Sequence, residues 1–227
     1  MADRNSWLHV ASLGVCGINS NSMRQRNIIR QTLIKDRTGT YQKRWQSDLE
    51  DENGGSPMDI GIEQWSEEWK KTVALPTTAK STTHNSFHCL EGIHLFALTN
   101  FLRRPILVIC DDFHRGDYDE PIAGVNVGGI YLPLLSDSVD CIKTPLLIRY
   151  HHGHFTEFVM AESNERVSLM KHDGQLMKLR CLLPVESNFS DRLLREYLNC
   201  LKLNYTNENG CITEILFAKM QVCDTCG

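Results

Sequence analysis

The chain reads Leu102-Arg103-Arg104-Pro105-Ile106-Leu107-Val108-Ile109-Cys110 across its centre and, after a polar excursion, Gly128-Gly129-Ile130-Tyr131-Leu132-Pro133-Leu134. The continuous apolar run 106–110 has the length of a strand and predicts one buried on both faces. Upstream of it, apolar residues at helical spacing predict a helix over 89–102 that stops before Pro105. This helix should have one apolar side made of Leu90, Ile93, Ala97, Leu98 and Phe101.

Working outward, helices are expected before this centre and strands after it. Helical patterns precede it in the first segment, around Leu8 to Val15, and at 22–33, 41–49 and 62–75, where Trp65 and Trp69 share one face. Loop signals occupy 50–57 and 76–85. Strand patterns follow at 129–134, 146–150 and 155–161, and closing helices are expected at 186–204 and 211–221. The fold class is therefore α+β, or mixed α/β, with helices packed around a small central sheet.

Composition excludes several classes of protein. With 227 residues, 41% hydrophobic and 23% charged, the chain is typical of a globular protein and unlike collagen, coiled coils or disordered chains. Its apolar runs are far shorter than the roughly 20 residues that cross a bilayer, and no leader pattern opens it. A net charge of −4 argues against a dedicated nucleic-acid binder. Nine scattered cysteines do not form a disulfide framework, which favours the reducing cytoplasm, with the nucleus as the alternative, and leaves one cysteine as a candidate nucleophile.

Two stretches together resemble the ovarian-tumour (OTU) cysteine deubiquitinases. They are the central stretch quoted above, with Leu90-Glu91 and His94 before it, and a later one that contains Pro145-Leu146, Tyr150 and Gly153-His154-Phe155. The similarity covers about residues 60 to 160 and is most specific to the subgroup that contains Cezanne, Trabid and the tumour-necrosis-factor-induced zinc-finger deubiquitinase. It implies an OTU cysteine-peptidase-like fold and hydrolysis of ubiquitin isopeptide bonds.

The resemblance extends back to the loop that carries the nucleophile. The family has an Asp-Gly-Asn-Cys-Leu run there, and the matching residues in this chain are Asp3-Arg4-Asn5-Ser6-Trp7. Ser6 therefore stands at the position of the catalytic cysteine. By the same resemblance, His154 would protonate the leaving amine, and backbone N–H groups of Asp3, Arg4 and Asn5 would form the oxyanion hole.

Serine is a poor replacement for the cysteine of such a site. A helix N-terminus and a nearby imidazolium stabilise a thiolate, whose thiol has an ordinary pKa of about 8.5, but they do not activate a neutral hydroxyl. Arg4 also replaces a glycine of the family's loop. The residue that orients the histidine belongs, in this subgroup, to a segment upstream of the nucleophile that we expect to be missing; other branches place it at the position of Thr156. The third triad member is left unassigned.

Other chemistry-bearing residues have structural interpretations. Glu91 is expected to form an ion pair with Arg103 or Arg104, and His94 is expected to be a core histidine with a hydrogen-bond partner. Cys110 is expected to be a small core residue. Cys223 and Cys226 form half of a zinc motif, so no complete metal site and no cofactor are expected. We divide the chain into an OTU domain over 1–221, lacking its N-terminal segment, and a tail over 222–227 that could begin a zinc-binding module.

Three functions remain open at this stage. The first is an OTU domain that binds ubiquitin or polyubiquitin and is catalytically impaired by Ser6, with neither nucleic acid nor a membrane as partner. The second is a non-catalytic interaction or scaffold module that has also lost ubiquitin binding. The third is a weak serine hydrolase that uses Ser6 and His154.

Overall fold

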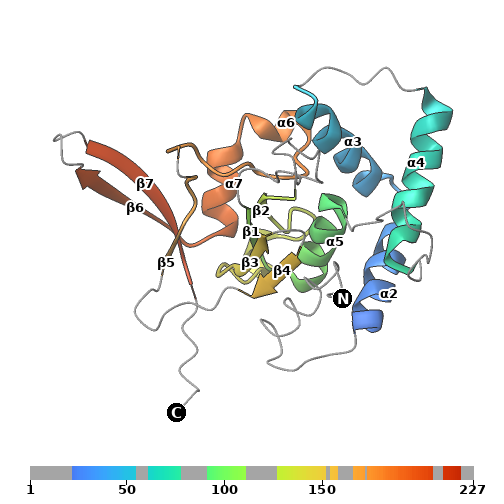
Figure 1. Cartoon of the computed structure of the whole chain (residues 1–227), viewed down its shortest axis with the longest axis horizontal. Helices are drawn as coiled ribbons and strands as arrows, with labels where there is room; N and C mark the ends of the chain where they lie inside the picture. The colour runs from blue at the N-terminus through green and yellow to red at the C-terminus, as the bar shows by residue number, and fades with distance from the viewer. Residues whose placement is uncertain are drawn as a thin grey trace, which may run out of the picture.

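The computed structural model describes residues 22–54, 61–77, 91–110, 127–151, 154–157, 166–171, 173–206 and 212–220. Among these residues, four α-helices precede the first strand: α2 (Ser22–Ile34), α3 (Thr40–Glu52), α4 (Ile62–Ala74) and α5 (Gly92–Leu102). They lie to one side of a small sheet, and a long hairpin extends away on the other side (Figure 1). The α+β class predicted from the sequence is confirmed, with helices packed around a small central sheet.

The central sheet has four strands in the order β2-β1-β3-β4. Their bounds are β1 Ile106–Cys110, β2 Gly129–Tyr131, β3 Leu146–His151 and β4 His154–Glu157. Strands β1 and β3 are parallel, and β2 and β4 run antiparallel to their neighbours. β2 is shorter than the predicted 129–134 because pairing stops at Tyr131, just before Pro133, which has no N–H to donate.

The central strands are buried on both faces, as the sequence predicted. Ile106 and Val108 of β1 pack into one core, while Leu107 between them packs into a second core on the opposite face. In β3, Ile148 belongs to the first core and Leu147 to the second. Successive side chains of a strand point to opposite faces of the sheet, and here each face is covered by other parts of the chain.

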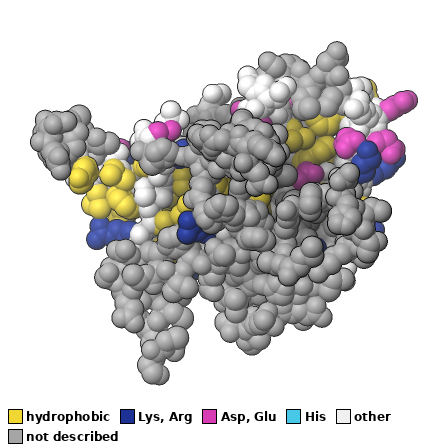
Figure 2. All heavy atoms as spheres, viewed as in Figure 1, with side chains coloured by type: hydrophobic (Ala, Val, Ile, Leu, Met, Phe, Trp, Pro, Cys, Tyr) yellow, Lys and Arg dark blue, Asp and Glu magenta, His cyan; other side chains and the backbone are white. Residues whose placement is uncertain are grey.

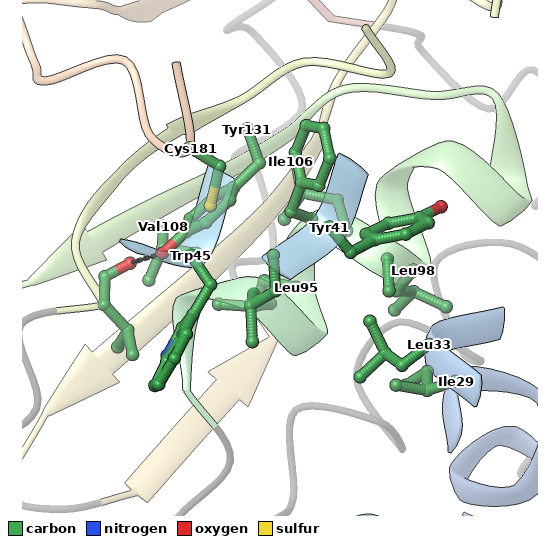
Figure 3. Packing of buried hydrophobic residues seen from close by; sticks show 14 of the residues in the cluster. Ile29, Leu33, Tyr41, Trp45, Leu95, Leu98, Ile106, Val108, Tyr131 and Cys181 are labelled. Atoms are coloured by element: carbon green, nitrogen blue, oxygen red, sulfur yellow. Dashed lines mark hydrogen bonds between the residues drawn. The ribbon is translucent and has the colours of Figure 1, made fainter. Parts of the chain in front are cut away.

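The first core joins the helices to the sheet. Figure 3 shows Ile29 and Leu33 from α2, Tyr41 and Trp45 from α3, and Leu95 and Leu98 from α5 gathered against Ile106 and Val108 of β1. α5 is buried over Gly92–Asn100, while Phe101 is 53% exposed. The predicted one-sided apolar helix is therefore wrong for α5, because the sheet and the other helices enclose it all around.

The third helix also differs from its expected pattern. α3 was predicted as a mostly polar helix ending at Leu49, yet it continues to Glu52, into the predicted loop, and buries Tyr41, Arg44, Trp45 and Asp48. These positions recur every three or four residues, so they form one helix face. Two of these four residues, Arg44 and Asp48, are charged. A prediction based on hydrophobicity therefore does not recognise this face as buried.

The C-terminal part of the chain agrees with the sequence prediction only in part. Of the residues described after 157, α6 (Pro184–Ser187) and α7 (Ser190–Tyr197) are helical, and α7 lies inside the helix predicted over 186–204. The segments β5 (Arg166–Ser168), β6 (Cys200–Thr206) and β7 (Ile212–Lys219) are strands. These strands make a second sheet in the order β5-β7-β6. Leu201, Leu203 and Tyr205 alternate with polar residues, a period of two that indicates a strand and that the predicted helices over 186–204 and 211–221 ignored.

Gly129, at the start of β2, is held against the segment that follows β5. A Cβ atom there would lie 2.5 Å from the backbone oxygen of Lys178, and its φ of +139° disfavours any L side chain. This close approach allows the N–H of Ile130 to donate to the Lys178 oxygen at 2.8 Å, and that of Arg180 to donate to the Ile130 oxygen at 2.9 Å. Only glycine permits this contact between β2 and the residues 178–180.

We therefore expect Gly129→Ala to reduce the free energy of unfolding by about 3 kcal/mol, from steric overlap and backbone strain together. Gly174→Ala is the matched control, because Gly174 also has a positive φ, +78°, but nothing lies within 4 Å of its added Cβ. The control should lose only about 1 kcal/mol. Urea unfolding measures both variants, and equal losses would show that the Lys178 contact is not what requires glycine.

Candidate functional site

The structure describes the predicted site at one of its residues. His154 is the first residue of β4, and it pairs in the antiparallel register with His151, the last residue of β3. Asp3, Arg4, Asn5 and Ser6 lie outside the described residues, as does the side chain of His154. The structure therefore fixes where the backbone of the predicted histidine lies in the sheet.

That place is the edge of the sheet at the carboxyl ends of its parallel strands. The parallel strands β1 and β3 end side by side, with Cys110 opposite Tyr150 in the register, and β4 begins at the same edge with His154. Ligands of open α/β sheets bind outside the carboxyl ends of parallel strands, where loops from several strands meet. The position of His154 is thus consistent with a role in catalysis. Thr156 lies two residues along β4, opposite Arg149.

Three of the four cysteines that the structure describes have thiols that burial keeps protonated. None of Cys110, Cys141, Cys181 and Cys200 is in a disulfide bond. Burial raises the pKa of the Cys141, Cys181 and Cys200 thiols, and a raised pKa keeps a thiol protonated and unreactive at neutral pH. Cys110 is half-buried and packs against the first core, which confirms its interpretation as a core residue.

Glu91 and His94, at the N-terminus of α5, form hydrogen bonds with residues of α3 and α4. The carboxylate of Glu91 accepts from the indole N–H of Trp45 at 2.8 Å and from the hydroxyl of Thr72 at 3.3 Å. The predicted ion pair of Glu91 with Arg103 or Arg104 is therefore wrong. Burial raises the pKa of Glu91, although both hydrogen bonds act to lower it. Arg104 instead donates to the backbone oxygen of Thr144 at 2.7 Å.

His94 confirms its interpretation as a buried structural histidine. It is fully buried, its Nδ1 accepts from the backbone N–H of Glu91 at 2.9 Å, and its Nε2 lies 2.9 Å from the backbone oxygen of Thr72. Because Nδ1 is an acceptor, the ring proton is on Nε2 and is donated to Thr72. Burial lowers the pKa of His94 to about 4, although the hydrogen bond from Nε2 to the Thr72 oxygen acts to raise it.

This histidine predicts a pH dependence of stability. Below its ordinary pKa of 6.5, the unfolded chain binds a proton at His94, whereas the folded chain stays neutral down to about pH 4. His94 therefore makes the folded state less stable as pH falls through this window, by up to about 1.4 kcal/mol per pH unit. Glu91, whose pKa is raised, contributes with the opposite sign above its ordinary value of 4.5.

The variant His94→Gln isolates this contribution, since glutamine can still accept from the Glu91 N–H and does not titrate. We expect the stability advantage of the wild type over the variant to shrink as pH is lowered from 6.5 toward 5, measured by denaturant unfolding. A difference that stays constant from pH 7.5 to pH 5 would contradict a low pKa for His94.

A trio of tryptophans fixes α4 to α3. The ring centroid of Trp45 lies 5.4 Å from that of Trp65, edge to face, and 5.4 Å from that of Trp69, tilted. Trp65 and Trp69 are one helical turn apart in α4, as the spacing predicted. Trp45 thus joins α4 and Glu91 to the first core at the same point.

Sequence reasoning missed a buried charge network between α3 and the segment 178–186. Arg44 binds both carboxylate oxygens of Glu186, at 2.6 and 2.7 Å. Arg180 contacts Asp48 at 2.7 Å and Glu52 at 2.6 Å. Asp48 also accepts from the backbone N–H of Cys181 at 3.0 Å. The partners are more than 120 residues apart, so no local pattern could have paired them.

Within the part of the chain that the structure describes, no group of three or more histidine, cysteine or acidic side chains is arranged to hold a metal ion. Among the same residues, no helix is both long and apolar enough to cross a membrane. The histidines at 84, 88 and 152 and the pair Cys223 and Cys226 lie outside the described residues.

Comparison with known proteins identifies the family. Residues 19–155 match the family described as OTU-like cysteine protease, a segment that includes His154 and begins after Ser6. The chain is 29% identical, over 215 residues, to tumor necrosis factor alpha-induced protein 3 of Homo sapiens, and equally to those of Macaca fascicularis and Mus musculus. These alignments cover 88% of this chain and 27% of the first two relatives, or 28% of the mouse protein, so the chain spans about a quarter of their length. The family match, together with the helices and mixed sheet described above, shows that this chain belongs to the OTU-like cysteine proteases.

Proposed function

We propose that this OTU domain binds ubiquitin or polyubiquitin and hydrolyses the isopeptide bond slowly or not at all. The observation that carries the proposal is Ser6 in the run Asp3-Arg4-Asn5-Ser6, where the family's pattern has cysteine. Family membership supports ubiquitin as the ligand, since the OTU deubiquitinases that the chain resembles act on ubiquitin conjugates.

The chemistry of the replaced atom supports impairment. A cysteine protease of this kind attacks the isopeptide carbonyl with a thiolate, and His154 would then give a proton to the lysine amine that leaves. A serine hydroxyl remains protonated under the same influences and needs a neutral histidine as general base, oriented by a carboxylate. The residue two positions after His154 is Thr156, which has no charge to supply.

The rest of the domain supports retained binding. The central strands β1 and β3 are packed on both faces, and α5 belongs to the core on one of them. The carboxyl ends of β1 and β3 meet beside the start of β4, the edge at which His154 lies. We therefore expect the ubiquitin-binding surface to be present.

The cysteines bear on the cellular compartment of the protein. We place the protein in the reducing cytoplasm, with the nucleus as the alternative, supported by the free thiols of Cys110, Cys141, Cys181 and Cys200. We also propose that the OTU domain spans 1–221 and that 222–227 begin a zinc-binding module, for which Cys223 and Cys226 would be ligands.

Titration of the full chain with ubiquitin and diubiquitin by calorimetry tests the proposal, with a ubiquitin-like modifier of another class as the control ligand. We expect saturable binding of ubiquitin alone, and little cleavage of polyubiquitin on a gel. Absence of binding would favour a scaffold module that has lost ubiquitin. Rapid cleavage that Ser6→Ala abolishes would instead establish a serine hydrolase.

A further inference from the structure

One face of the β6–β7 hairpin lies outside both core clusters of the described residues. The antiparallel register pairs Leu201 with Phe217 and Leu203 with Ile215, so these four residues and Tyr205 alternate onto the same side of the two strands. We call this side the outer face. It carries a continuous stripe of five large apolar side chains along the hairpin, which extends away from the central sheet (Figure 1).

The opposite side of the hairpin has a structural role. Cys200, Leu216 and Ala218 are on this inner side, and all three pack in or against the second hydrophobic core. Nearer the turn, Lys202 of β6 and Glu214 of β7 form an ion pair on the same inner side. The fold of the second sheet is thus stabilised from the inner side, and the outer stripe belongs to neither core cluster.

The outer face is open to solvent. Leu201 and Leu203 are each 41% exposed, and Tyr205 is 58% exposed. Ile215 and Phe217 beside them are half-buried. Figure 2 shows hydrophobic side chains gathered over this hairpin, with Lys and Arg side chains next to them. A contiguous apolar patch of this kind, rimmed by charge, is typical of a surface that binds another protein segment.

The charge on this face has one sign. Arg166 of β5 and Lys219 of β7 are paired in the register at the base of the stripe, on the outer side, and both are exposed. The outer face has no carboxylate among the residues that the structure describes, because Glu214 lies on the inner side with Lys202. The complementary partner therefore carries apolar side chains and, beside them, carboxylates.

The size of the face distinguishes a short segment from a second copy of the chain. Stable protein–protein interfaces bury about 800 Å² and roughly 20 to 30 residues on each side. The described outer face offers five apolar side chains and two cations, which is well below that size. An extended or helical segment of a partner can bind such a face, whereas a homodimer built on it alone would be marginal.

We propose that the outer face of the β6–β7 hairpin is a docking surface for a short acidic segment with apolar side chains. Leu201, Leu203 and Tyr205 provide the apolar contacts, and Arg166 and Lys219 pair with the carboxylates. The surface lies on the second sheet, while His154 lies on the first. Docking here does not depend on ubiquitin binding or on the state of Ser6.

Selection of displayed random peptides, about 12 residues long, against the full wild-type chain tests this proposal. The selected peptides should be rich in leucine, isoleucine or phenylalanine together with aspartate and glutamate. Their affinity should fall about tenfold or more for the double variant Leu203→Ser/Tyr205→Ser and for the charge reversal Arg166→Glu/Lys219→Glu. Lys202→Gln, which removes a cation from the inner side of the same hairpin, should bind as the wild type does.

Several results would overturn the proposal. Peptides that bind the outer-face variants as tightly as the wild type would place the binding elsewhere. A wild-type dimer in sedimentation velocity that the Leu203→Ser/Tyr205→Ser variant abolishes would identify the occupant as a second copy. Displacement of the selected peptides by ubiquitin would make the face part of the ubiquitin site. Thermal unfolding is the control for each variant. We expect the folded state to be retained, since the changed side chains lie outside both cores.

Discussion

Replacing Ser6 by cysteine is expected to raise polyubiquitin cleavage by about 100-fold or more over the wild-type chain. The substitution exchanges one atom, oxygen for sulfur, and supplies a thiol that the helix N-terminus and an imidazolium can ionise near neutral pH. His154, at the carboxyl edge of the parallel strands, is then available to protonate the leaving amine. Cleavage of fluorescent diubiquitin under single-turnover conditions measures the gain.

Two controls connect the gain to the proposed site. Ser6→Ala should be as inactive as the wild type, since neither has a thiol at position 6. The double variant Ser6→Cys/His154→Gln should lose most of the gain, because glutamine cannot transfer the proton. If Ser6→Cys alone gives no activity, Ser6→Cys/Arg4→Gly restores the glycine of the family's loop and should recover it. Inactivity of both cysteine variants would contradict the assignment of the nucleophile to Ser6.

Removing the charge of Arg180 is expected to destabilise the domain by about 3–5 kcal/mol. The side chain of Arg180 is 3% exposed, and that of its partner Asp48 is 9% exposed. In Arg180→Met the carboxylate of Asp48 would remain buried without its cation, and such an uncompensated charge costs far more than the net value of an ion pair. Denaturant unfolding at neutral pH measures the loss.

The matched control is Arg192→Met in α7. Arg192 also forms an ion pair, with Glu196 one turn along the helix at 3.4 Å, but its side chain is 65% exposed. Exposed pairs contribute about 1 kcal/mol or less, so the control should remain near wild-type stability. A loss for Arg180→Met as small as that of the control would mean that the segment 178–186 is not held to α3 by this network.

The residues that could be predicted from sequence are those whose pattern is local. The run Ile106–Cys110 indicated a buried strand because β-branched and aliphatic residues without interruption leave no polar face. Trp65 and Trp69 indicated the inner face of α4 for a similar reason. In both elements, residues close together in the sequence were enough to predict which side chains are buried.

The predictions that failed had two causes. The helices expected across β6 and β7 overlooked a local signal, the period of two in Leu201, Leu203 and Tyr205, and the seven-residue pairing of the two strands outweighs the helical preference of leucine and lysine there. Glu91 was expected to bind an arginine, but Trp45, 46 residues earlier, provides its partner instead. The site itself was predicted from resemblance to a family, and its loop at 3–6 stays a prediction because it lies outside the described residues.

The most direct measurement is the reaction of the chain with ubiquitin that carries a thiol-reactive electrophile at its C-terminus, followed by intact mass. We predict no adduct on the wild-type chain, despite its nine cysteines, and one adduct on Ser6→Cys, located by peptide mapping at position 6. An adduct on the wild-type chain at any of its own cysteines would contradict the proposal, because a cysteine other than one at position 6 would then be the nucleophile.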